Sequence, residues 1–149
     1  MVILHVLNAV NLFLLGKMSL EDIRYFSISM KETVIYLMFG FICGFIRMDM
    51  LDLVTALIPG IFLLIIAFIS NQKIGYGDAL IVLSNGFWLG SRKMFISLSV
   101  SMILVFLVSL VMLIRYRYVN KTELKDRRIA FIPFIFTGTL TAFLYACFS

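Results

Sequence analysis

The residues of this chain that could do chemistry are its carboxylates, of which there are eight. They are Glu21, Asp22, Glu32, Asp49, Asp52, Asp78, Glu123 and Asp126. Asp78 follows Gly75-Tyr76-Gly77 and precedes the apolar run 79–90, where a charged group is costly unless it has a partner or a function. Two carboxylates that share one water can hydrolyse an amide bond. The ionised one takes a proton from the water, and the protonated one donates to the carbonyl oxygen.

Five of the eight carboxylates have simpler explanations. Asp49 and Asp52 lie in a short turn between apolar segments and are expected to be solvated loop charges. Glu123 and Asp126 stand among lysines and arginines, which is typical of surface ion pairs that contribute little to stability. Glu32 lies at the start of an apolar segment, where a negative charge favours the N-terminus of a helix.

The remaining candidates are Asp22, with Glu21 beside it, and Asp78. Asp78 could instead be a helix N-cap that accepts hydrogen bonds from the first free N–H groups. A cap does not explain why Gly75 and Gly77 precede it. Glycines at these positions allow positive φ angles and the close approach of another backbone. Spacing alone leaves both interpretations, the cap and the functional carboxylate, open.

The composition indicates an all-α, polytopic membrane protein. Of the residues, 62% are hydrophobic and 14% are charged, whereas about a quarter of the residues of soluble domains are charged. The length allows a single integral-membrane domain over residues 1–149. Segment 1–16 has no basic region before its apolar stretch and no small-residue cleavage site after it. It is therefore expected to stay as a first membrane helix rather than to be removed as a signal peptide.

The net charge of +5 does not require a nucleic-acid partner, because membrane proteins keep an excess of Lys and Arg on their cytoplasmic side. Cys43 and Cys147 stand alone in apolar runs, and neither belongs to a C-x-x-C pair. His5 is expected to be a packed side chain of the first segment. We therefore expect no metal site and no cofactor.

The apolar segments predict about six transmembrane helices. They are 1–16, 33–46, 51–70, 79–90, 94–114 and 129–148. With both termini outside, only Arg47, Arg92 and Lys93 of the thirteen Lys and Arg residues face outward, in agreement with the positive-inside rule. This topology sends the predicted loops 17–32, 71–78 and 115–128 to the cytoplasmic face. Asp22 and Asp78 are then expected to meet there.

The stretch "GYGDALIVLSNGFWLG", residues 75–90, resembles the signature of the type IV prepilin peptidases. In this family of intramembrane aspartyl proteases, G-x-G-D opens a membrane helix that closes with a second pair of glycines. Gly86 and Gly90 match that pair, and their spacing predicts a face on which another helix packs closely. The resemblance implies that Gly75, Tyr76 and Gly77 form the motif that precedes a catalytic Asp78.

The first catalytic aspartate of the family precedes a membrane helix in a motif that "EDIRYFSISMK", residues 21–31, partly matches. Asp22, Arg24 and Ile28 are in register, whereas Ser29 and Met30 replace the family's Pro-Asn. The resemblance therefore implies a catalytic pair of Asp22 and Asp78, with Glu21 as the competing carboxylate.

The resemblance also implies a substrate class. It is a prepilin or pseudopilin whose short basic leader stays in the cytoplasm and is cut off at the inner face of the cell membrane. The cysteine-rich insertion that larger members use for methylation is missing, so the chain resembles the small, protease-only form. The basic loop 115–128 is expected to contact anionic membrane lipid.

Three other interpretations compete with this one. The first is a non-catalytic subunit of a pilus or secretion assembly, in which Asp22 and Asp78 only cap helices. The second is a proton- or ion-coupled carrier, which lacks support because no acid continues a path through the membrane. The third is a protease related to presenilin, whose first aspartate follows a tyrosine within a helix, a pair that this chain lacks.

Overall fold

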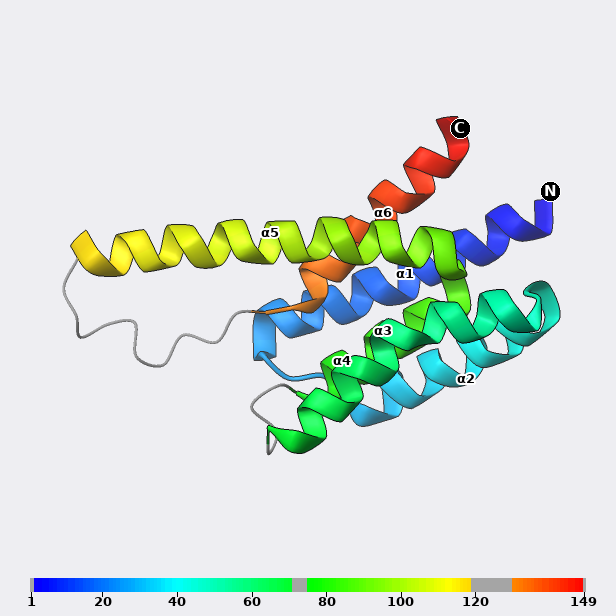
Figure 1. Ribbon diagram of the computed structural model, residues 1–149, viewed down its shortest axis with the longest axis horizontal. Helices are drawn as coiled ribbons and strands as arrows, with labels where there is room; N and C mark the ends of the chain where they lie inside the picture. The colour runs from blue at the N-terminus through cyan, green and yellow to red at the C-terminus, as the bar shows by residue number, and fades with distance from the viewer. Residues whose placement is uncertain (1, 71–74, 119–129, 149) are drawn as a thin grey trace.

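The computed structural model describes residues 2–70, 75–118 and 130–148, and the regular structure in these ranges is α-helical (Figure 1). The helices are α1 (Val2–Tyr25), α2 (Met30–Arg47), α3 (Met50–Ile69), α4 (Tyr76–Leu89), α5 (Ser91–Tyr118) and α6 (Ile132–Phe148). The predicted all-α class is confirmed. Glu123 and Asp126 of the expected basic loop lie outside the described residues, as do the side chains of His5 and Cys147.

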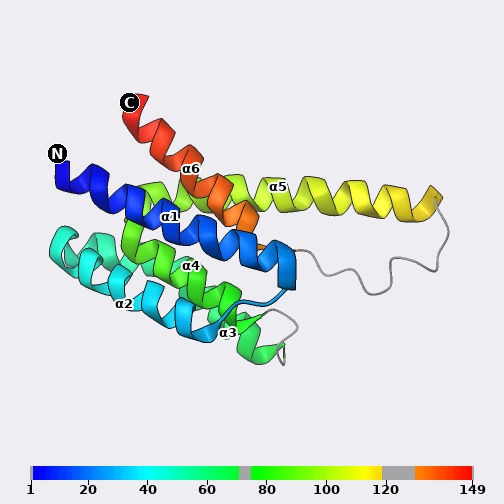
Figure 2. The ribbon, with the colours of Figure 1, turned by 180° about the vertical axis from the view of Figure 1, so that it is seen from behind.

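The helices divide into two groups that pack against each other. In one group α6 lies between α1 and α5, and in the other α4 packs against both α2 and α3. Figure 2 shows the first group above and the second below. Asp22 belongs to the first group and Asp78 to the second, so the candidate site lies where the two groups meet.

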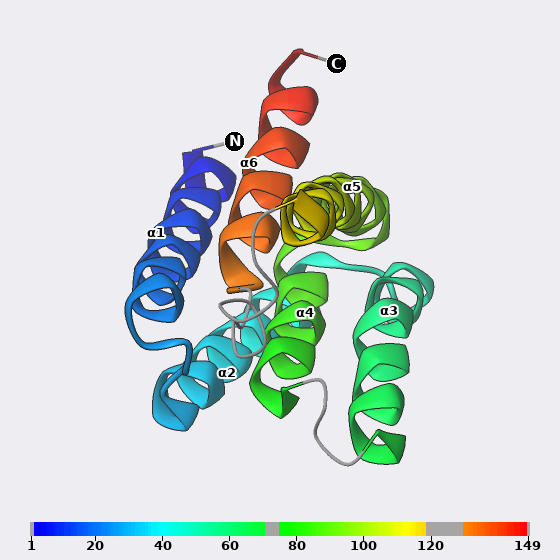
Figure 3. The same cartoon turned by 90° about the vertical axis from the view of Figure 1, so that its left-hand side faces the viewer.

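Helix α4 is short and is largely enclosed by other helices. Figure 3 shows it between its neighbours α2 and α3, and nine of its residues are buried. Close packing depends on glycines. A Cβ atom on Gly40 of α2 would lie 2.8 Å from the Trp88 indole nitrogen, and one on Gly86 would lie 2.5 Å from the Ala56 carbonyl oxygen of α3. The predicted packing role of Gly86 is therefore confirmed.

The turn between α4 and α5 corrects two sequence-based expectations. Gly90 ends α4 with a φ angle of +76°, so it makes the turn rather than extending a helix-packing face. Asp52 is not a solvated loop charge. It lies in the first turn of α3, and its carboxylate accepts hydrogen bonds from the backbone N–H of Ser91, at 3.1 Å, and from the Ser91 hydroxyl. It thereby caps the start of α5.

Helix α1 is longer than the predicted segment 1–16. It continues through the expected loop to Tyr25, because residues 17–25 are mostly good helix formers. The next residue, Phe26, terminates the helix: it adopts a left-handed φ of 49°, and its N–H donates to the Asp22 carbonyl at 2.9 Å. Asp22 is therefore held on a rigid helix.

Many large apolar side chains lie on the surface and several polar side chains lie inside, which is unlike a soluble protein. Large apolar side chains such as Phe62, Phe68 and Phe106 are exposed, whereas Asn11 and Asn85 are buried. Among the described residues, two helices, Met50–Ile69 and Ser91–Arg115, are long and apolar enough to cross a membrane, and Ile132–Ala146 is a shorter apolar helix. Six spans with both termini outside stay a prediction.

Candidate active site

Asp22 is positioned by the last turn of α1 and by the beginning of α6. Its side chain is only 5% exposed, and its Oδ2 atom accepts a hydrogen bond from the backbone N–H of Ile132 at 3.1 Å. Ile132 is the first residue of α6, and the first N–H groups of a helix have no acceptor within the helix. The contact therefore satisfies one such donor and fixes the orientation of the Asp22 carboxylate.

Asp78 lies in the first turn of α4, ahead of the apolar segment 79–90. Gly75, not Asp78, is the N-cap residue, and the N–H of Asp78 donates to the Gly75 carbonyl at 3.1 Å. A Cβ atom on Gly75 would lie 3.2 Å from Asp78 Oδ2, so the carboxylate folds back over this glycine. Within the described residues the Asp78 carboxylate has no hydrogen-bond partner, and its side chain is not a cap.

The two aspartates interact electrostatically. Burial raises the pKa of Asp78 from 3.8 to about 6, and the negative charge of Asp22 contributes to the same rise. A carboxyl group in this setting exchanges its proton near neutral pH, as acid–base catalysis requires. Asp22 and Asp78 are thus near enough for the charge of one to affect the pKa of the other.

Glu21 has a different environment from its neighbour. Its Oε1 atom lies 3.8 Å from the ammonium group of Lys17, which also donates to Glu32 at 2.6 Å. Successive residues of a helix point about 100° apart. Glu21 accordingly pairs with Lys17 and does not face the Asp78 carboxylate as Asp22 does. The geometry favours Asp22 over Glu21 as the partner of Asp78.

The glycines before Asp78 do not use the positive φ that glycine allows. Gly75 has a φ angle of −62°, and Gly90 is the one described glycine with a positive φ. A Cβ atom on Gly77 would lie 3.4 Å from the Ile28 side chain. Ile28 belongs to the first motif, so the two motifs are in contact. Tyr76 is half-buried at the start of α4.

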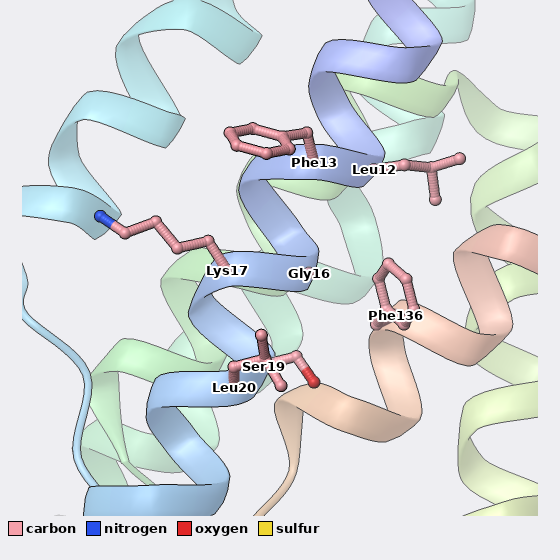
Figure 4. Close-up of a pocket in the computed structure, with 7 residues that line it drawn as sticks. All are labelled: Leu12, Phe13, Gly16, Lys17, Ser19, Leu20 and Phe136. Carbon is pink, nitrogen blue, oxygen red and sulfur yellow. The ribbon is translucent and has the colours of Figure 1, made fainter.

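An apolar groove of about 470 Å³ lies between α1 and α6 (Figure 4). It is lined by Leu12, Phe13, Gly16, Lys17, Ser19, Leu20 and Phe136. The Phe136 ring faces α1 at Gly16, where a Cβ atom would lie 3.3 Å from it. Ser19, which lines the groove, lies one turn before Asp22 on α1.

The structure also contains site features that the sequence analysis missed. The contact of the Ile132 backbone N–H with Asp22 cannot be inferred from the sequence. Asn11 and Asn85 are buried and hydrogen-bonded between helices, and a lone amide within an apolar segment is a signal that could have identified them. Within the described residues no cluster of three His, Cys, Asp or Glu side chains could hold a metal ion.

Comparison with known proteins gives one family. The model of the type IV leader peptidase family matches residues 9–115, which is well over half of the chain and includes both aspartates. No curated protein and no solved structure matches the chain.

Proposed function

Because the chain belongs to the type IV leader peptidase family, we propose that it is an intramembrane aspartyl endopeptidase that removes the short basic leader of prepilin-like proteins. The observation that carries this proposal is the raised pKa of Asp78: burial, together with the smaller effect of the Asp22 charge, raises it to about 6. Two carboxylates close enough to share a proton can hydrolyse a peptide bond without a covalent intermediate.

In the proposed mechanism the pair holds one proton and one water molecule. The ionised carboxylate removes a proton from the water as its oxygen attacks the scissile carbonyl carbon, and the protonated carboxylate donates to the carbonyl oxygen. The newly protonated carboxyl then gives its proton to the leaving amine as the C–N bond breaks. The other carboxylate takes a proton back from a hydroxyl of the gem-diol as the product carbonyl forms, so the pair again holds one proton. The two groups titrate together, so the acid and base roles belong to the pair. The Ile132 N–H keeps Asp22 oriented throughout.

The proposed substrate has a basic leader in the cytoplasm followed by an apolar helix in the membrane. The cytoplasmic ends of α1 and α4 would then receive the cleavage point. The groove between α1 and α6 would receive the apolar helix, because the groove is apolar and its lining includes Ser19, one turn before Asp22 on α1. The N–H groups of Tyr76 and Gly77, in the first turn of α4, have no acceptor within the helix. They are suited to pair with an extended substrate backbone.

A non-catalytic membrane subunit is the second candidate function, and one observation favours it. Asp22 accepts a hydrogen bond from the first N–H of α6, which is what a capping residue does. Asp78 makes no such contact within the described residues, so capping explains one aspartate and leaves the other unexplained.

The Asp→Asn variants separate the two functions. An asparagine keeps the side-chain oxygen that caps a helix but cannot exchange the proton that hydrolysis needs. A prepilin-like substrate is co-expressed with the wild type, Asp22→Asn, Asp78→Asn and Glu21→Gln, and its shortening is followed on gels. We expect at least a thousandfold loss of cleavage in both asparagine variants and nearly full cleavage in Glu21→Gln.

The amount of each variant in the membrane is measured on the same samples by immunoblot. Normal cleavage by both asparagine variants would leave the aspartates as caps and refute the proposed aspartyl peptidase mechanism. Cleavage by Asp22→Asn together with loss of cleavage in Glu21→Gln would move the catalytic role to Glu21.

A further inference from the structure

Five buried polar side chains form a chain of hydrogen bonds across the bundle, and each comes from a different helix. The Tyr36 hydroxyl of α2 donates to Asn11 of α1 at 2.6 Å and lies 3.3 Å from the Asn85 side-chain oxygen of α4. The Asn85 amide donates to Thr139 of α6 at 3.0 Å, and Thr139 lies 3.1 Å from the hydroxyl of Ser97 of α5. These five residues, here called the polar chain, are at most 1% exposed.

The polar chain crosses the same interface as the aspartate pair. The contact between Tyr36 and Asn11 joins α2 to α1, and the contact between Asn85 and Thr139 joins α4 to α6. Both contacts therefore connect the two groups of helices, whose most extensive backbone packing is internal to each group. The carboxylates of Asp22 and Asp78 must meet across this interface as well.

The polar chain is also in register with the site groups along each helix. Asn85 follows Asp78 by seven residues on α4, and Thr139 follows Ile132 by seven residues on α6. Asn11 precedes Asp22 by eleven residues on α1. At about 100° per residue, seven and eleven residues both return to within about 20° of the starting direction. Each of these helices thus presents one polar-chain residue and one site group on the same side.

Stability is a poor explanation for these polar residues. The side-chain nitrogen of Asn11 is buried and has no hydrogen-bond partner among the described residues, which is costly in a membrane interior. Hydrogen bonds between membrane helices contribute modestly to stability. Their better-attested effect is to fix register, since apolar surfaces can slide past each other and a buried polar pair cannot.

We propose that the polar chain sets the rotation and depth of α1 and α6 against α4, and so aligns Asp22, Asp78 and the Ile132 N–H for catalysis. Asn85 and Tyr36 are then positioning residues, because they act through the aspartates and not on the substrate. The inference rests on the proposed peptidase function, and the two can fail separately.

Two variants and one matched control test the inference. Asn85→Leu keeps the size of the side chain and removes its hydrogen bonds. Tyr36→Phe removes one hydroxyl and keeps the ring that stacks on Trp88, with centroids 5.9 Å apart. The control is Ser84→Ala, because Ser84 is equally buried on α4 but bonds only to the Leu80 carbonyl of its own helix, at 2.8 Å.

We expect kcat to fall at least tenfold in Asn85→Leu and several-fold in Tyr36→Phe, with KM changed less than twofold and Ser84→Ala unaffected. The alkaline limb of the pH–rate profile should move to lower pH in both variants. Asp22 is the described charged group that raises the pKa of Asp78, so moving it away lowers that pKa. A smaller amount of folded enzyme would lower the rate without moving the profile. Unchanged kcat and an unmoved limb in both variants would overturn the inference.

A second measurement does not depend on cleavage. Spin labels are placed on Ile23→Cys and Ile69→Cys in a background without Cys43 and Cys147. Both positions are exposed and lie in the last turn of α1 and of α3, so their distance reports the separation of the two helix groups. We expect a narrow distance distribution in the parent and in Ser84→Ala, and a shifted or broadened one in Asn85→Leu and Tyr36→Phe.

Identical distributions in all four proteins would overturn the inference even if the enzyme is active. A parent that cleaves nothing would refute the proposed function, and the label distances alone would then decide whether the polar chain sets the register. If Asn85→Leu does not accumulate in the membrane, both measurements are made on Tyr36→Phe, which loses only one oxygen atom.

Discussion

At the scale of single residues, the ionised form of Asp78 is energetically unfavourable in the folded protein. The pKa of this carboxyl rises from 3.8 to about 6 because its burial and the neighbouring charge of Asp22 both disfavour ionisation. Within the described residues no hydrogen bond offsets these effects. A group that opposes folding when ionised, at the start of an otherwise well-packed helix, is more consistent with catalysis than with stabilisation.

Asp78→Asn is therefore expected to stabilise the protein at neutral pH while it abolishes cleavage. Because the pKa in the folded protein is the higher one, the wild type loses stability as the pH rises from about 4 to about 6. The rise in pKa corresponds to at most about 3 kcal/mol. Asp78 is partly exposed, so solvent screening reduces this to about 1–2 kcal/mol.

The measurement is thermal unfolding in detergent at pH 5 and pH 7.5. At pH 7.5 the variant should unfold about 2–6 °C above the wild type, and at pH 5 the difference should shrink. Asp49→Asn, at an exposed position, is the control and should change little. A variant less stable than the wild type at pH 7.5 would indicate that the ionised Asp78 stabilises the fold after all.

At the scale of elements, glycines decide how closely α4 approaches its neighbours. Gly86 lies against the backbone of α3, whereas Gly77 faces only the end of the flexible Ile28 side chain. The same change from glycine to alanine should therefore have different effects at the two positions of one helix.

Gly86→Ala is expected to cost about 1–3 kcal/mol, since an added methyl group meets the Ala56 carbonyl oxygen and overpacks the interface. Gly77→Ala should leave the unfolding temperature and the amount of protein in the membrane nearly unchanged. Thermal unfolding in detergent and immunoblots compare the two variants. Equal unfolding temperatures would mean that α4 can move away from α3 without penalty.

The sequence predicted the helices better than it predicted the contacts between them. Six apolar segments correspond to six helices, because apolarity over sufficient length is a strong signal in a membrane protein. The extension of α1 to Tyr25 was missed because its charged residues resemble a loop. The capping of α5 by Asp52 was missed because it joins parts of the chain that are distant in sequence.

The candidate site was predictable in part for the same reason. Asp22 and Asp78 could be chosen from their motifs, and Glu21 could not be separated from Asp22 until the ion pair with Lys17 was known. The Ile132 N–H and the polar chain depend on helix rotation. No local pattern in the sequence records how two helices are rotated against each other.

At the scale of the whole molecule, the proposed cleavage needs both aspartates on the side of the membrane where the leader lies. Lys17, Arg24 and Lys31 flank the connection between α1 and α2, whereas Arg47 is the one basic residue near the connection between α2 and α3. The positive-inside rule then predicts that the first connection is cytoplasmic and the second is external.

Reporter fusions test this orientation. Alkaline phosphatase, which is active only outside the cytoplasm, should be inactive when fused after Ser27 and active when fused after Met48. A fluorescent protein that folds only in the cytoplasm, fused at the same positions, is the reciprocal control. Phosphatase activity at Ser27 would show that the topology is the opposite one. The aspartates would then lie on the other side of the membrane from the leader.

The hydrogen bond between Asp22 and Ile132 has a consequence for biosynthesis. Asp22 lies on α1, and its donor lies on α6, which is translated after α2 to α5. The family signature, with both aspartates, is complete in the nascent chain before α6 has been translated. A chain that stalls in between carries both carboxylates but lacks the group that orients one of them. We therefore expect proteolytic competence to arise only once α6 has inserted.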